Sequence, residues 1–132
     1  MTRYGIDAAT LLHLVGEQVV VDPAHGLVAP NGIRSQALQL LLDAVRAGAT
    51  SERDALRCHE RVTEVKVRLL GDRVSRRTAW ELARELDCPV SVAEVLAVTR
   101  LQADALVTVD AALAHTATGV VPLASVEDLS RP

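Results

Sequence analysis

The sequence predicts an α/β fold with three α/β/α layers around a central, mostly parallel sheet. Two observations predict it. Short apolar strand patterns alternate with amphipathic helical patterns along the chain. The strand patterns are rich in Val, Leu and Ile, as strands covered on both faces are. With 132 residues, 49% of them hydrophobic, the chain is expected to form one domain over residues 1–132 without disulfides.

The first half of the chain contains two expected strands and three expected helices. The strands are "YGIDA", which ends near Asp7, and "LVAP". The helix "ATLLHLVGEQ" has one apolar face, and the helix "SQALQLLLDAVRAG" ends at Gly48. Apolar residues cover more than one face of this second helix, so it is either central or shared between the core and a partner chain. A long charged helix is expected over 50–70, capped by Thr50 or Ser51.

The second half of the chain alternates helices and strands more regularly. The helix "SRRTAWELARELD" is expected to begin at a Ser75 cap and to place Trp80 in the core or at an interface. The helix "SVAEVLAVTRLQA", the strand "ALVTV", the short helix "AALAHT" and the strand "GVVPLA" follow. The strand "ALVTV" runs directly into Asp110.

Composition excludes several classes of protein. No apolar run approaches the roughly 18 residues of a membrane span, and the N-terminal sequence lacks a signal-peptide layout, so we expect a cytoplasmic protein with no membrane partner. The net charge of −3 argues against a general nucleic-acid coat. Cys58 and Cys88 lie far apart and have no zinc-ligand spacing, so both are expected to be reduced and packed.

Two carboxylates are expected at the same edge of the sheet. Asp7 and Asp110 each follow a predicted strand, and ligands of open parallel sheets bind outside the carboxyl ends of the strands. Neighbouring carboxylates repel each other unless a cation or a shared proton lies between them. A hard divalent cation such as Mg²⁺ is held by such oxygens and leaves room for phosphate oxygens. A helix N-cap or a turn is the alternative role for either aspartate.

The segments that carry these aspartates resemble a known family. "YGIDAATLLHLV" is similar to the opening of a PIN domain, and "LQADALVTVDAALA" is similar to its closing motif. The chain most resembles the VapC-type toxins of bacterial toxin–antitoxin pairs, particularly actinobacterial ones. The resemblance extends over nearly the whole chain and implies a PIN-like fold and an Mg²⁺-dependent ribonuclease, with Mn²⁺ as an alternative metal. It also implies an RNA substrate, a VapB-type antitoxin and a homodimer.

The site residues that the resemblance implies are assigned position by position. Asp7 matches the first metal acid of the family and Asp110 matches a late one. Thr108, two residues before Asp110, matches a hydroxyl that lines the family's site. The implied catalytic residues are therefore Asp7, Thr108 and Asp110, and the implied metal ligands are Asp7, Asp110 and Glu94.

Two acids of the family pattern are missing or displaced. The position of one is occupied by Val92, with Glu94 two residues later, and the region of another reads Ser35-Gln36. Glu94 has two interpretations with equal support: a metal ligand, or the partner of Ser91 in a capping box. A site with fewer carboxylates holds Mg²⁺ more weakly. The alternative function is therefore a degenerate PIN domain that binds an antitoxin or RNA without cleaving it.

One segment carries a local excess of positive charge. Between residues 66 and 77 a single acid, Asp72, accompanies five basic residues: Lys66, Arg68, Arg73, Arg76 and Arg77. These side chains either contact RNA phosphates or form a solvated face balanced by acids from neighbouring segments.

Overall fold

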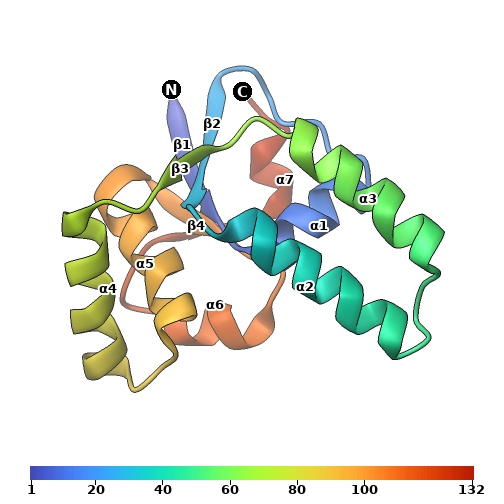
Figure 1. The fold of residues 1–132 in the computed structure, drawn as a ribbon. Coiled ribbons are helices and arrows are strands. Elements are labelled where there is room, and N and C mark those ends of the chain that lie inside the picture. Colours follow the sequence, from blue (N-terminus) through green and yellow to red (C-terminus); the bar gives the residue numbers. More distant parts are fainter.

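A five-stranded parallel sheet forms the centre of the protein, as a computed structural model of residues 1–132 shows (Figure 1). Its strands are β1 (Thr2–Ile6), β2 (His25–Pro30), β3 (Arg68–Leu70), β4 (Ala105–Val107) and β5 (Leu123–Ala124). The strand order is β3-β2-β1-β4-β5, and every neighbouring pair is parallel. The predicted α/β class with its mostly parallel sheet is therefore confirmed.

Seven helices cover the two faces of the sheet. They are α1 (Ala8–Gly16), α2 (Ile33–Arg46), α3 (Glu52–Glu64), α4 (Arg73–Leu86), α5 (Val90–Gln102), α6 (Ala111–Ala117) and α7 (Val126–Leu129). Helices α1, α2, α3 and α7 lie on one side of the sheet and α4, α5 and α6 on the other (Figure 1). These are the three layers that the alternating pattern predicts. No helix is long and apolar enough to cross a membrane.

Each face of the sheet has its own hydrophobic core. Fully buried members of the core against α1, α2, α3 and α7 are Ile6, Leu11, Ile33, Val62 and Leu129. The core against α4, α5 and α6 includes Ala79, Leu96, Leu106 and Ala117. Helix α5 comes closest to the sheet at Gly5, where a Cβ atom would lie 2.0 Å from Oγ1 of Thr99. Only glycine permits this approach, which holds the last turn of α5 against β1.

The long charged helix expected over 50–70 is shorter than predicted. It begins after Ser51, whose hydroxyl accepts the N–H of Asp54 as a cap, and it ends at Glu64. Residues 68–70 form β3 instead, paired with the last three residues of β2. The β-branched residues Val65 and Val67 favour an extended chain, and pairing with β2 supplies the hydrogen bonds that a helix would otherwise provide.

Two predicted helix starts are wrong. The cap of α4 is Asp72, whose Oδ1 accepts the N–H of Ser75 at 2.9 Å, so Ser75 lies buried within the first turn. Helix α5 begins after Pro89 and has no side-chain cap, so the capping box of Ser91 and Glu94 does not form. A proline can end an extended segment and start a helix because its fixed φ suits both.

Helix α2 and Trp80 are less buried than one of the two predictions made for each. Helix α2 buries only Ile33 and Ala37, so it is not central to the core. Three of its leucines are about two-fifths exposed: Leu38, Leu40 and Leu42. Trp80 is 58% exposed on α4 and is therefore not a core residue. For both helices the remaining prediction is contact with a partner.

Candidate functional site

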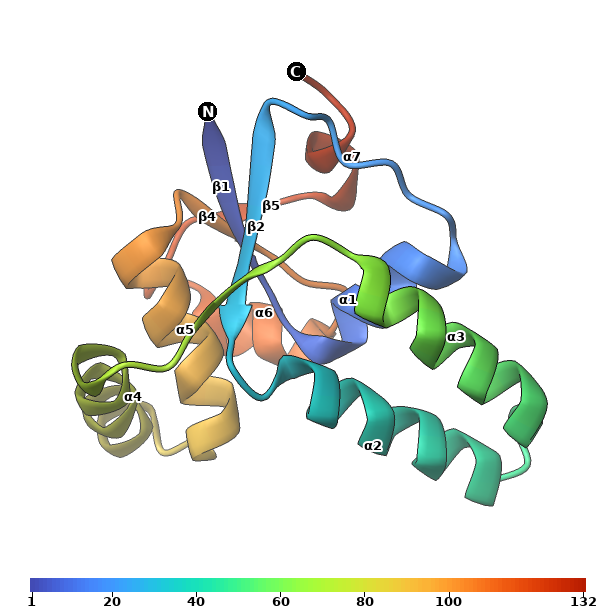
Figure 2. The ribbon, with the colours of Figure 1, turned by 45° about the horizontal axis from the view of Figure 1, so that its top comes forward.

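A cleft of about 360 Å³ lies at the carboxyl edge of the sheet and contains both predicted aspartates. Asp7 follows β1 directly, and Asp110 follows β4 by three residues. Helices α1, α2, α5 and α6 surround this end of the sheet, toward which the strand arrows point (Figure 2). The parallel pairing of β1 with β4 brings together two residues that are 103 positions apart in the sequence, as predicted.

Asp7 is held by a neighbouring threonine. It occupies the N-cap position of α1 with extended backbone, but its side chain caps no N–H group of the helix. Instead, its Oδ1 accepts the hydroxyl proton of Thr10, which is fully buried one turn later. The Thr10 oxygen in turn accepts the N–H of Val109 at 3.1 Å. Thr10 therefore links the Asp7 carboxylate to the loop that carries Asp110.

Asp110 has the N-cap role that the sequence left open as an alternative. Its Oδ1 accepts the N–H groups of Ala112 at 2.9 Å and Leu113 at 3.2 Å. The predicted strand "ALVTV" ends early, at Val107, because the Thr108 hydroxyl accepts the N–H of Asp110 at 3.1 Å and turns the chain. Thr108 thus orients the loop and does not itself line the cleft.

The oxygen atoms of this cleft suit a hard divalent cation. Asp7 and Asp110 each use only Oδ1 for hydrogen bonds within the chain, which leaves both Oδ2 atoms free. Two carboxylates with several waters are a usual way of holding Mg²⁺. No group of three or more His, Cys, Asp and Glu side chains gathers anywhere in the protein, and Glu94 is not among the residues that line the cleft. The predicted third ligand therefore does not join the two aspartates.

The remaining lining of the cleft is polar but uncharged, or apolar. Gln36 and Gln39 of α2 and Ser91 of α5 contribute amide and hydroxyl groups. Val92 lines the cleft at the position where the family pattern has an acid. The first turns of α1 and α5 border this space, and the positive ends of their helix dipoles favour carboxylates and phosphates, whereas the N-terminus of α6 is already capped by Asp110.

Sequence reasoning did not identify Thr10 as a site residue. It lies on the apolar face of α1 among Leu11 and Leu14, where a threonine is expected to be a packing residue. The spacing Asp7-x-x-Thr10 is the one available signal, because residues three apart share a helix face. The second hydrogen bond of Thr10 goes to Val109, which no local pattern reveals.

Comparison with known proteins supports the fold but gives no information about the activity. No protein-family model matches the sequence, and no curated protein matches it. Among solved structures, the chain is similar to the crystal structure of PAE2754 from Pyrobaculum aerophilum, with a TM-score of 0.73 and 23% sequence identity. The similarity covers 98% of this chain and 93% of that chain. The three-layer α/β arrangement is therefore shared over almost the full length of both proteins.

Proposed function

We propose that the protein is an Mg²⁺-dependent endoribonuclease of the VapC type, with Mn²⁺ as an alternative metal. The observation that carries the proposal is the pair Asp7 and Asp110, which line one cleft at the carboxyl edge of the sheet with a free Oδ2 each. Aspartates at this edge can hold a cation against the phosphodiester of an RNA strand. The sequence resemblance to PIN domains supports the same assignment.

The roles of the residues follow from their contacts. Asp7 and Asp110 would hold the cation, while Thr10 fixes the orientation of Asp7 and Thr108 that of the Asp110 loop. When bound, the cation neutralises phosphate charge and lowers the pKa of a coordinated water. The first turns of α1 and α5 would attract the phosphate into the cleft.

RNA cleavage by the purified protein tests this function. We expect Mg²⁺-dependent cleavage of single-stranded RNA that is lost in Asp7→Asn and in Asp110→Asn. Asp54→Asn removes the same charge from an exposed position on α3 and is expected to cleave normally, so it is the matched control. Thermal melts establish that the variants are folded. Equal cleavage by the protein and Asp7→Asn would rule out the proposed site.

A second candidate function rests on Val92. Its side chain lines the cleft in place of an acid, and Gln36 provides a neutral amide where the family pattern has a Glu. These substitutions favour a degenerate PIN domain that binds an antitoxin or RNA without cutting. Calorimetric titration with Mg²⁺ separates the two candidates: saturable binding that disappears in Asp110→Asn favours the enzyme. Cleavage gained only in Val92→Asp favours the degenerate domain.

The biological setting of the proposal comes from the resemblance. We propose on this ground that the protein acts in the cytoplasm as the toxin of a type II toxin–antitoxin pair and is neutralised by a VapB-type antitoxin. The exposed leucines Leu38 and Leu42, one turn apart on α2, support contact with such a partner or with a second copy in a homodimer.

A further inference from the structure

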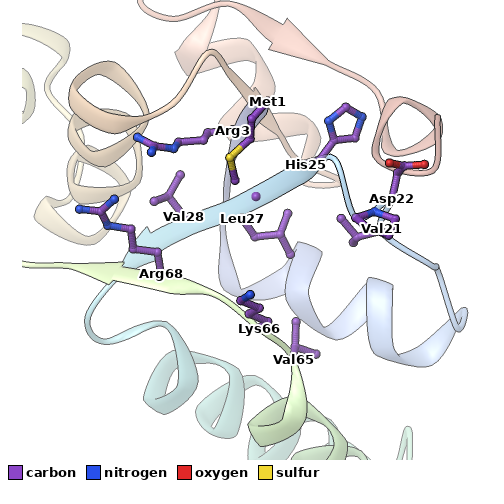
Figure 3. Close-up of a pocket in the computed structure, with 12 residues that line it drawn as sticks. Met1, Arg3, Val21, Asp22, His25, Leu27, Val28, Val65, Lys66 and Arg68 are labelled. Atoms are coloured by element: carbon purple, nitrogen blue, oxygen red, sulfur yellow. The ribbon is translucent and has the colours of Figure 1, made fainter. Parts of the chain in front are cut away.

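A second, larger cleft lies beside β2, at the other end of the sheet from Asp7. Its volume is about 500 Å³, within the range of small-molecule sites. Strand β3 pairs only with Val28, Ala29 and Pro30, so the first half of β2 has no strand neighbour on the side away from β1. Figure 3 shows the segment of Val65 and Lys66 diverging from β2 and leaving the cleft between them.

Three basic side chains line this cleft without any partner in the protein. Arg3 comes from β1, Lys66 from the segment that leads into β3, and Arg68 from β3 itself (Figure 3). The only two salt bridges in the protein involve other residues. The one acid in the lining, Asp22, uses its Oδ1 to accept the N–H of Ala24. The cleft therefore has a net positive charge in a protein whose overall charge is −3.

The register of the sheet places the two arginines on the same face of the sheet. Arg3 pairs with Gly26, and Arg68 pairs with Val28. Paired residues, and residues two apart on a strand, share one face, so Arg3 and Arg68 project from the same face of the sheet. Two strand spacings and two residue rises separate their Cα atoms by roughly 12 Å. Gly26 has no side chain to fill the surface between them.

We propose that this cleft binds a ligand with two or more linked phosphate groups, held by Arg3, Lys66 and Arg68. The guanidinium fork matches the geometry of phosphate oxygens, and two arginines on one face with a lysine from another segment suit several phosphates better than one. The cleft differs from the aspartate site: Arg3 lies four residues before Asp7 on β1, roughly 13 Å along the strand. The inference does not depend on the proposed nuclease activity.

Titration calorimetry without divalent cations tests the cleft with two probes, inorganic tripolyphosphate and a short single-stranded RNA. We expect saturable binding of at least one probe, weakened by about tenfold or more in Arg3→Gln/Arg68→Gln. The control Arg73→Gln/Arg76→Gln removes the same charge from exposed positions on α4 and is expected to bind normally. Gly26→Leu fills the cleft and is expected to abolish binding. Its Cβ would meet only the flexible end of Met1, at 3.0 Å, and Arg3 Cγ at an ordinary contact distance of 3.8 Å, so the variant is expected to fold.

Which probe responds identifies the source of the phosphates. Tripolyphosphate binding that depends on the two arginines indicates a small phosphorylated compound, and a response confined to RNA indicates the backbone of a nucleic acid. The proposal is overturned by the absence of saturable binding or by equal weakening in the α4 control. Full affinity in Gly26→Leu, or equal affinity for a poly-glutamate peptide, overturns it as well.

Discussion

Replacing Thr10 by valine tests the link between the two halves of the aspartate site. The substitution keeps the shape of a fully buried side chain but removes its hydroxyl, which donates to the Asp7 carboxylate and accepts the N–H of Val109. A hydrogen bond to a charged group contributes about 1.5–3 kcal/mol, so we expect the free energy of unfolding to fall by about 2 kcal/mol. Unfolding entropies near 2.1 cal/mol/K per residue, over 132 residues, convert this loss to a drop in Tm of about 7 °C.

Urea denaturation followed by circular dichroism measures the effect of Thr10→Val. Thr63→Val is the control, because the Thr63 hydroxyl also donates a hydrogen bond, to the carbonyl of Glu60, but on the exposed surface of α3. We expect the control to change the free energy of unfolding by less than about 0.5 kcal/mol. A similarly small change in Thr10→Val would refute the view that this hydroxyl holds Asp7 in place.

Two further predictions concern the fold around the sites. Gly5→Ala would place a Cβ atom 2.0 Å from Oγ1 of Thr99, so in urea denaturation it is expected to lower the free energy of unfolding by about 1–3 kcal/mol. A cost no larger than that of Gly16→Ala, where nothing lies within 4 Å, would contradict the close approach of α5. Hydrogen bonds from Ser75 lower the pKa of Asp72 in the folded protein. The stability that Asp72 contributes is therefore present above its unfolded pKa and is lost as the pH falls through the folded value. As the pH falls below the unfolded pKa of Asp72, the protein should therefore lose more stability than the Asp72→Asn variant does. Parallel pH profiles of stability for the two proteins would disprove this.

The class of the fold could be predicted because its signals are local and repeated. Apolar strands and amphipathic helices alternate, and the strand-end positions of Asp7 and Asp110 follow from that alternation. Strand β3 could not be predicted in this way, because its three residues follow a charged helical pattern and become a strand only through pairing with β2. Short segments with weak propensity take the structure that their tertiary neighbours supply.

The candidate site could be predicted only in part, for a related reason. Its two carboxylates stand next to apolar strands and are visible in the sequence. The role of Thr10 depends on a hydrogen bond to Val109, 99 positions away, that forms only after folding. The sequence also could not decide between Asp72 and Ser75 as the cap of α4. Both residue types can start a helix, and only the folded geometry selects Asp72.

The unpaired first half of β2 also bears on how copies of the protein behave toward one another. An open strand edge presents free backbone groups to any other extended chain, and this is a common route to aggregation. Here Lys66 and Arg68 stand beside that edge, so two copies that met edge to edge would bring like charges together. The same side chains that we assign to phosphate binding would therefore also oppose the assembly of copies into continuous intermolecular sheets.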